Sequence, residues 1–242
     1  MFIGWLIVGV IKGGAHLIFL GRPLRAWRIV FRPTSSWLSQ GILFVLAFAL
    51  FAAIQMALTR WAPASALEIV FKVLAGAAAL AVATYTGFVL NSIKAVPFWN
   101  SRLLPVLFVL CGILGGFGLS VVIALNGGGI NLDTAETGAR WLLVINAFLI
   151  GIYLWIAAGR ETTGKKSVLE QIRGNLAPFF WTGVVGLGII VPLCVALITQ
   201  LTGEVSASLI LAGVACEIVG GMTLRYCVLK AGAYKPLVAR PQ

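Results

Sequence analysis

Charged side chains are scarce in this sequence, and acidic ones most of all. Only 10% of its 242 residues are charged, with seven acidic and eighteen basic side chains, while 60% are hydrophobic. A soluble domain has about a quarter charged residues, which it needs to cover its surface. The deficit of charge therefore excludes a water-soluble globule, and the apolar excess excludes intrinsic disorder. The composition indicates an integral membrane protein.

Histidines and paired cysteines, the usual ligands of haems and metals, are almost absent. The only histidine, His16, cannot form a bis-histidine haem site within this chain. Cys111, Cys194, Cys216 and Cys227 occur singly in apolar segments, without a CxxC pair, and are interpreted as small buried hydrophobes. No Walker loop, nucleophile elbow or HExxH motif is present. We therefore expect no haem and no metal in this chain.

Long apolar stretches are abundant, and each can cross a bilayer as a helix. A spanning helix needs about 20 mainly apolar residues. Hydrophobicity within each stretch is continuous rather than alternating, which disfavours a transmembrane barrel. The expected fold is all-α, a polytopic membrane helix bundle of about seven transmembrane helices in a single domain, 1–242. The predicted spans are 2–20, 41–58, 69–90, 103–125, 141–158, 179–201 and 207–229.

The basic residues lie mostly in alternate connections between these spans. One side of the membrane holds 21–40, 91–102, 159–178 and the tail 230–242, with thirteen Lys and Arg, against two on the other side, Arg60 and Arg140. The positive-inside rule then predicts the N-terminus outside and the C-terminus inside. The net charge of +11 needs no nucleic acid, because membrane lipids with anionic headgroups attract such a face. An acidic soluble subunit is the alternative partner for it.

Two segments on the basic side have unusual compositions. In the predicted basic interfacial loop 21–40, four arginines alternate with Trp27, Phe31 and Trp37. This pattern is typical of an interfacial anchor, and equally of a basic pocket between two prolines. The second segment, 85–105, begins with Tyr85 and Asn91 near the end of the third span, and its connection 91–102 contains the string PFWN.

Four charged residues, Lys12, Lys72, Glu217 and Arg225, lie inside the predicted spans. Lys12, Lys72 and Glu217 are expensive to place in lipid, which makes them functional candidates. Lys72 is close enough to its helix end for its ammonium to reach the interface. Glu217 lies near mid-membrane, where it could pair with Lys12 or, together with it, belong to a proton path.

Four ordered strings resemble the NrfD type of polysulfide-reductase membrane subunit. Family members show a similar LGRP.R.WR loop, a PFWN..LLP connection before a helix rich in small residues, and a G...LRY ending. The strings extend from the first predicted helix to the last and are together far more specific than any one of them. They are LGRPLRAWR (20–28), FRPTSSW (31–37), VPFWNSRLLPVLFVLCGILGG (96–116) and GGMTLRY (220–226).

The resemblance implies a haem-free anchor in a prokaryotic cytoplasmic membrane. Such anchors bind a quinone, menaquinone or ubiquinone, next to an iron–sulfur partner subunit. That partner exchanges electrons with a molybdopterin-type catalytic subunit. The resemblance also implies at least eight helices, so we expect the family's first helix to be missing here. Best-known relatives place the LGRP and PFWN loops in the periplasm, whereas the charge pattern of this chain favours the cytoplasm.

Site residues follow from the family motifs one at a time. Tyr85 matches a tyrosine that precedes a glycine before the PFWN loop and that looks like a quinone ligand. Phe19 stands where relatives often have Asp or His, and His16, one helical turn earlier, could replace that group. Arg22 and Asn91 would complete the polar end of the quinone site, and Trp99 could form its wall.

Each of these side chains also has a purely structural interpretation. His16 could serve in packing, Trp99 could belong to an interfacial belt, and Arg225 could reach the interface from a helix end. Two other classes of function remain open at this point. A small transporter would show an internal repeat or broken helix pairs, which we do not find, and a structural anchor would bind no quinone.

Overall fold

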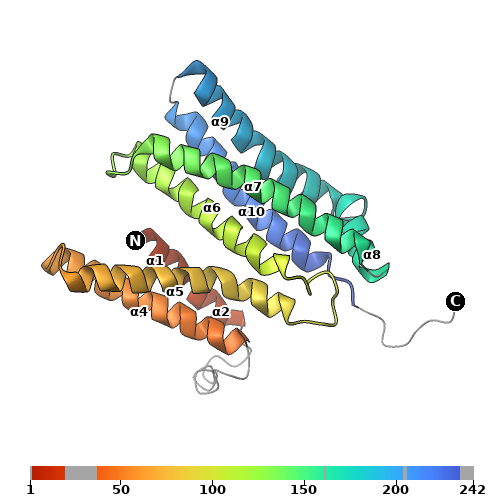
Figure 1. Ribbon diagram of the computed structural model, residues 1–242, viewed down its shortest axis with the longest axis horizontal. Helices are drawn as coiled ribbons and strands as arrows, with labels where there is room; N and C mark the ends of the chain where they lie inside the picture. The colour runs from red at the N-terminus through yellow and green to blue at the C-terminus, as the bar shows by residue number, and fades with distance from the viewer. Residues whose placement is uncertain (1, 20–36, 161, 204–205, 235–242) are drawn as a thin grey trace. The chain divides into compact units, whose positions relative to one another are not determined.

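The structure is a computed structural model that describes residues 2–19, 37–160, 162–203 and 206–234. Most of these residues are helical, and none of them forms a strand (Figure 1). The helices are α1 (Phe2–Trp5), α2 (Gly13–Phe19), α4 (Trp37–Trp61), α5 (Ala66–Asn91), α6 (Leu103–Leu125), α7 (Leu132–Gly159), α8 (Thr162–Ile172), α9 (Val191–Thr202) and α10 (Ala207–Lys230), with the π-helical segments η1 (Leu6–Lys12) and η3 (Phe179–Ile190).

Six described helices are long and apolar enough to cross a membrane, and they confirm the all-α polytopic fold. They are α4, α5, α6, α7, α10 and the continuous pair η3–α9. The first predicted span is also helical, through α1, η1 and α2, but its apolar part, Phe2–Ala15, is shorter than the others. Large side chains such as Phe148, 71% exposed, and Trp155, 77% exposed, face outward from α7. Such apolar surfaces suit a lipid environment.

Helix α7 begins nine residues before the predicted span 141–158. Asn131 caps it, because the Asn131 side chain accepts a hydrogen bond from the backbone N–H of Thr134 at 3.2 Å. The first turns are polar, with Asp133 and Glu136, so hydropathy places the start of the span later than the start of the helix. The acidic first turn also complements the positive end of the helix dipole.

The chain divides into two compact units, Met1–Val89 and Leu90–Gln242. In the N-terminal unit, an apolar cluster joins α4 and α5 and includes Phe48, Ala52, Val82 and Tyr85. Two hydrogen bonds add to this packing, one between α1 and α4 and one in the connection between α4 and α5. Trp5 Nε1 donates to the Ala49 carbonyl oxygen at 2.9 Å, and the Ala64 N–H donates to the Glu68 carboxylate at 2.7 Å.

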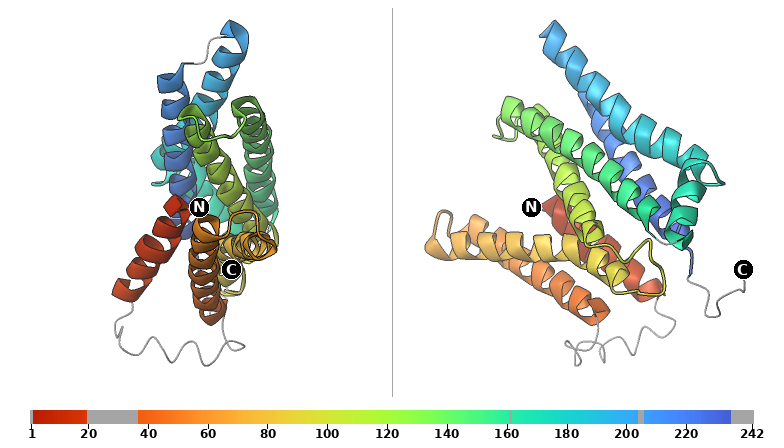
Figure 2. Two further views of the ribbon diagram at one scale, coloured as in Figure 1. Left: turned by 90° about the vertical axis from the view of Figure 1, so that its left-hand side faces the viewer. Right: turned by 45° about the vertical axis from the view of Figure 1, so that its right-hand side comes forward.

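The C-terminal unit is a bundle in which α6, α7, η3–α9 and α10 run side by side (Figure 2). Helix α10 packs closely on η3, where the Cα atoms of Gly188 and Gly220 approach so nearly that a Cβ on Gly220 would collide with the Gly188 backbone. Close approach through glycines is the usual way for helices to associate in lipid. The main core cluster of this unit includes Phe98, Tyr153, Val184 and Cys227.

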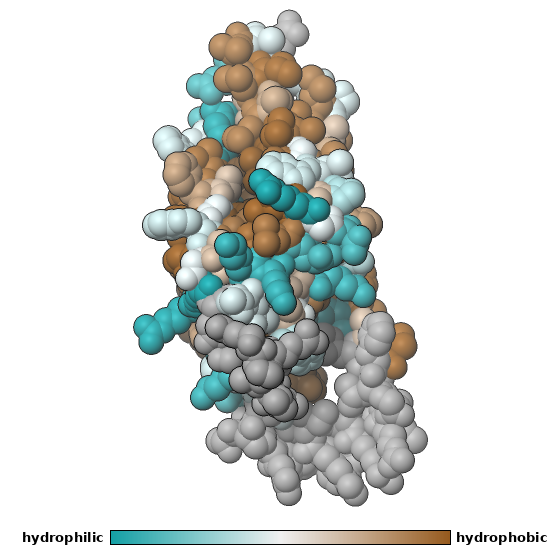
Figure 3. Space-filling model, turned by 90° about the vertical axis from the view of Figure 1, so that its right-hand side faces the viewer, coloured by the Kyte–Doolittle hydropathy of each residue, from teal (hydrophilic) through white to brown (hydrophobic). Residues whose placement is uncertain are grey.

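Helix α8 lies in the predicted connection 159–178. Its face with Thr163, Ser167 and Gln171 is buried, while Lys165 and Lys166 are exposed. Figure 3 shows hydrophilic side chains gathered at the level of α8, with mainly apolar surface above them. This end of the C-terminal unit therefore has the polar, basic character predicted for the connection.

The predicted basic interfacial loop 21–40 lies mostly outside the described residues, as do residues 235–242 of the predicted tail. The expected single domain over 1–242 stays a prediction, and each unit is described by itself below.

Candidate functional sites

Tyr85 lies on α5, inside the apolar cluster of the N-terminal unit. Its residue is 5% exposed, and its ring lies directly against the backbone of Gly41 on α4. A Cβ at position 41 would come within 3.0 Å of Tyr85 Cγ and closer still to the ring edge. Gly41 is therefore the residue that makes room for the tyrosine ring between the two helices.

The Lys12 ammonium lies over the same ring, with Nζ 4.7 Å from the centroid of Tyr85. Lys12 ends the π-helical segment η1, so three helical segments of the N-terminal unit meet at this tyrosine. A cation over an aromatic face gains from the negative charge of the ring face, and more so away from water. The structure thus brings together two of the predicted residues, Tyr85 and Lys12, although the sequence places them in different roles.

The structure says less about three other predicted quinone ligands, His16, Arg22 and Asn91. His16 belongs to helix α2, one turn beyond Lys12, but its side chain lies outside the described residues, and so does Arg22. Asn91 is the last residue of α5 and is half-buried. The roles assigned to these three residues stay predictions.

Trp99 holds the PFWN connection to the end of α10. Its indole Nε1 donates to the Val228 carbonyl oxygen at 2.7 Å. Its ring lies so close to Gly232 that a Cβ there would meet Trp99 Nε1 at 2.8 Å. These contacts give Trp99 a structural role in the C-terminal unit, while its predicted role as a wall of the quinone site stays a prediction.

Two further side chains fix the same connection from α7 and its end. The buried Tyr153 hydroxyl donates to the Phe98 carbonyl oxygen at 2.7 Å, and Arg160 Nη1 donates to the carbonyl oxygens of Pro97 and Asn100. The loop 91–102 is therefore held by the C-terminal bundle at four successive residues, 97 to 100. Sequence reasoning missed Tyr153 and Arg160, which lie far from the loop in the sequence.

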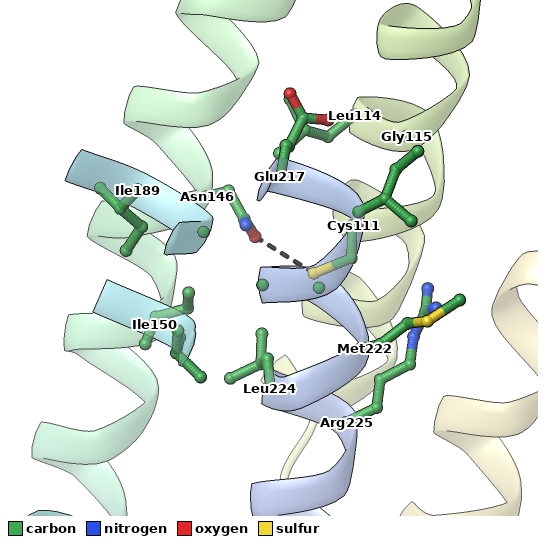
Figure 4. A pocket seen from close by; sticks show the side chains of 15 residues that line it. Cys111, Leu114, Gly115, Asn146, Ile150, Ile189, Glu217, Met222, Leu224 and Arg225 are labelled. Carbon is green, nitrogen blue, oxygen red and sulfur yellow. Dashed lines mark hydrogen bonds between the residues drawn. The ribbon is translucent and has the colours of Figure 1, made fainter. Parts of the chain in front are cut away.

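Glu217 lines a cavity inside the C-terminal unit (Figure 4). The cavity has a volume of about 100 Å³. Glu217 and Arg225 project into it from α10, Cys111 from α6 and Asn146 from α7, and Cys111 Sγ donates to Asn146 Oδ1 at 3.5 Å. Asn146 is a buried polar residue in an apolar helix, a signal of the same kind that singled out Glu217.

The described residues contain no group of three His, Cys, Asp or Glu side chains placed to hold a metal ion. Nothing in these ranges therefore identifies a metal-ligand set.

Comparison with known proteins identifies the family. The sequence model described as "Polysulphide reductase, NrfD" matches residues 1–236. The chain belongs to this family. It is 29% identical to Protein NrfD of Escherichia coli (strain K12), over 94% of this chain and 81% of that protein. It is 27% identical to the C subunit of polysulfide reductase from Wolinella succinogenes, over 93% and 82%, and 24% identical to the Protein NrfD homolog of Haemophilus influenzae, over 94% and 82%.

Membership of the NrfD family confirms the resemblance drawn from the four strings, and the structure places two of those strings. The string at 96–116 forms the second half of the PFWN connection and the first turns of α6. The string GGMTLRY forms the part of α10 that packs on η3. Of the strings at 20–28 and 31–37, only Trp37 lies within the described residues, where its ring stacks on Phe88 with centroids 4.7 Å apart. The six spanning helices and the family together identify a multi-pass membrane protein.

Proposed function

We propose that this chain is the quinone-binding membrane subunit of a redox complex, exchanging electrons between the quinone pool and an iron–sulfur partner subunit. The proposal rests above all on Tyr85, a buried hydroxyl-bearing ring with the Lys12 ammonium over its face. A quinone has an apolar body and two carbonyl oxygens, so its site needs an apolar slot with a few hydrogen-bonding groups at the polar end. The N-terminal unit has apolar side chains around Tyr85 and two polar groups, the Tyr85 hydroxyl and the Lys12 ammonium.

The residues present fit the chemistry of a quinone. The Tyr85 hydroxyl can donate a hydrogen bond to a carbonyl and accept one from the hydroxyl of the reduced form. The Lys12 charge favours electron density on a nearby oxygen. Phe48 and Val82 pack in the same apolar cluster as Tyr85. His16, one turn after Lys12 on the same helical run, is the proposed proton acceptor, because imidazole exchanges protons near neutral pH.

Oxidation of a quinol releases two electrons and two protons. The electrons leave to the partner, since the sequence offers no pair of histidines for a haem that would carry them across the bilayer. The family motifs add Arg22, Asn91 and Trp99 as further candidate quinone ligands. Both products leave on the basic side of the membrane, so this part of the reaction separates no charge.

Two observations support the proposed partner subunits: the name of one relative and the basic face of this chain. One relative is named as a lettered subunit of polysulfide reductase, which makes it part of an enzyme with several subunits. We infer that this protein likewise acts beside other subunits, an iron–sulfur protein and through it a molybdopterin-type catalytic subunit. The exposed Lys165 and Lys166 of α8 belong to the basic face, which we assign to the cytoplasmic side of a prokaryotic inner membrane and to the docking of the partner.

Gentle purification from native membranes tests this function. The measurements are the iron and the molybdenum or tungsten content of whatever co-purifies, and extraction of bound quinone. We expect an iron–sulfur subunit and bound quinone. A folded single polypeptide without metal or quinone would contradict the proposal and favour a transporter, whereas a metal-containing complex without quinone would leave only a structural anchor.

A further inference from the structure

Glu217 occupies an unusual position in the middle of α10. Its residue is only 8% exposed, and within the described residues its Oε1 has no hydrogen-bond partner. It lies against α6 at a glycine, since a Cβ on Gly118 would be 3.4 Å from Glu217 Oε1. A buried carboxylate oxygen without a partner is costly, so the group needs either a proton or water.

Two cavities meet at this side chain. The first is the cavity of about 100 Å³ that extends along α10 to Arg225. The second, of about 60 Å³, extends the other way to Glu136 and Arg140, near the beginning of α7, and Glu217 lines it as well. One water molecule needs about 10–15 Å³ of such space, so both cavities can hold several. Glu217 is the one residue that both linings share.

Polar groups continue from Glu217 toward each end. On one side, Asn146 and Arg225 line the first cavity, and Figure 4 shows the Glu217 carboxylate and Arg225 at its two ends. On the other side, Arg140 Nη1 donates to Gln200 Oε1 at 2.8 Å, while its buried Nε has no partner among the described residues. Buried polar atoms without a protein partner are the positions that internal water occupies.

The wall formed by η3 adds an independent observation. Val184, Gly188 and Ile189 of this π-helical segment line the first cavity. Local π-helical turns are rare and occur frequently at functional sites. Here the π-helical segment lines the same cavity as the buried carboxylate.

We propose that Glu217 is the central protonation site of a proton path through the C-terminal unit, reached by water from both cavities. The carboxylate accepts a proton from water in one cavity and returns it to water in the other, with no net change to the protein. The charged or titratable groups facing it are Cys111 from α6, Glu136 and Arg140 from α7, and Arg225 from α10; η3 and α9 contribute none to the two linings. Glu217 is the only one of these side chains that lines both cavities, so Glu217 is the group that cycles.

Every residue of this path lies in the C-terminal unit, and Tyr85 and Lys12 lie in the other. The path therefore does not rest on the proposed quinone site. The two proposals can fail separately, and the experiment reads both.

The test uses the complex purified from native membranes, as wild type and as Glu217→Gln, Glu217→Asp and Asp133→Asn. Asp133 is the matched control, because it is an exposed carboxylate of the same unit that lines neither cavity. Each complex is treated with dicyclohexylcarbodiimide, an apolar reagent for protonated carboxyls, and labelling is located by mass spectrometry. Proton flux is measured with a pH-sensitive dye in proteoliposomes under a potassium diffusion potential.

We expect labelling of Glu217 in the wild type and in Asp133→Asn. We also expect proton flux at least tenfold lower in Glu217→Gln, and partly retained in Glu217→Asp because it keeps a carboxyl. Buried Cys227 staying unreactive to maleimide verifies the fold of each variant. An unlabelled Glu217, or flux in Glu217→Gln equal to wild type, overturns the proposal. Quinone content measured on the same samples tests the N-terminal site separately.

Discussion

The two units of this protein place their intramembrane charges in different surroundings. In the N-terminal unit, the Lys12 ammonium lies over the ring of Tyr85, 4.7 Å from its centroid. In the C-terminal unit, the Glu217 carboxylate lies where two cavities meet, with Oε1 unpaired among the described residues. A charge in lipid needs either a compensating partner or access to water. The Lys12 charge thus lies beside an aromatic ring, and the Glu217 charge lies beside internal cavities.

The largest loss of stability is expected at the contact between the Gly188 and Gly220 backbones in the C-terminal unit. In Gly220→Ala, the new Cβ collides with the Gly188 backbone, so α10 and η3 must separate, at a cost of about 3 kcal/mol. Cys227, fully buried on α10, should then react with maleimide at a lower temperature. Gly221→Ala is the matched control, because a Cβ there meets nothing within 4 Å. Equal thermal profiles for the two variants would show that the helices do not touch at Gly220.

The second effect is a local loss of stability in the PFWN connection, 91–102, of the C-terminal unit. Tyr153→Phe removes the hydroxyl that donates to the Phe98 carbonyl, which costs about 1–3 kcal/mol for an unpaired buried acceptor. The amides of Trp99 and Asn100 should exchange with deuterium at least about tenfold faster. Tyr226→Phe, at a partly exposed tyrosine of α10, should leave that exchange unchanged. Unchanged exchange in Tyr153→Phe would mean that other contacts hold the loop.

The third effect is a loss of quinone affinity in the N-terminal unit, at Tyr85. Tyr85→Phe keeps the ring under Lys12 and removes only the hydroxyl, so the quinone Kd should rise about tenfold, the equivalent of one hydrogen bond. The measurement is a quinone titration of the purified complex, with Tyr226→Phe again as control. A Kd unchanged by Tyr85→Phe, in a complex that does bind quinone, would remove Tyr85 from the site.

The smallest effect on quinone affinity is expected from the Lys12 ammonium, which lies over the Tyr85 ring. Lys12→Met keeps the length of the side chain and removes its charge, so quinone affinity should fall by about twofold to fivefold, within the range of one cation–aromatic contact. Lys72→Met is the matched control, because Lys72 is an exposed residue of α5. Similar affinities for both variants would show that Lys12 serves only the packing of η1.

Much of the fold follows from hydrophobic runs alone, because lipid demands long apolar helices. Hydropathy identifies the lipid-facing part of a helix and not its full length, so the predicted span 141–158 begins nine residues after the start of α7 at Leu132. The capping residue Asn131 was the available signal. Helix α8 was missed for a related reason, since its buried face carries Thr163, Ser167 and Gln171 instead of apolar residues.

The candidate sites were less predictable, because they join residues far apart in the sequence. Family motifs pointed to Tyr85, but nothing in the sequence placed Lys12 over its ring or Gly41 against it. Glu217 was found because a charge in an apolar span needs a reason. Its neighbours Asn146 and Arg140 come from α7, and only packing shows that they share cavities with it.

The central claim is that quinone binds in the N-terminal unit, at Tyr85. Photo-crosslinking tests it most directly, with a light-activated quinone analogue on the purified complex, followed by mapping of the labelled peptide. We expect labelling of the α5 peptide that contains Tyr85, and we expect it to be diminished by excess natural quinone and by Tyr85→Phe. Labelling confined to residues 103–230 of the C-terminal unit would contradict it.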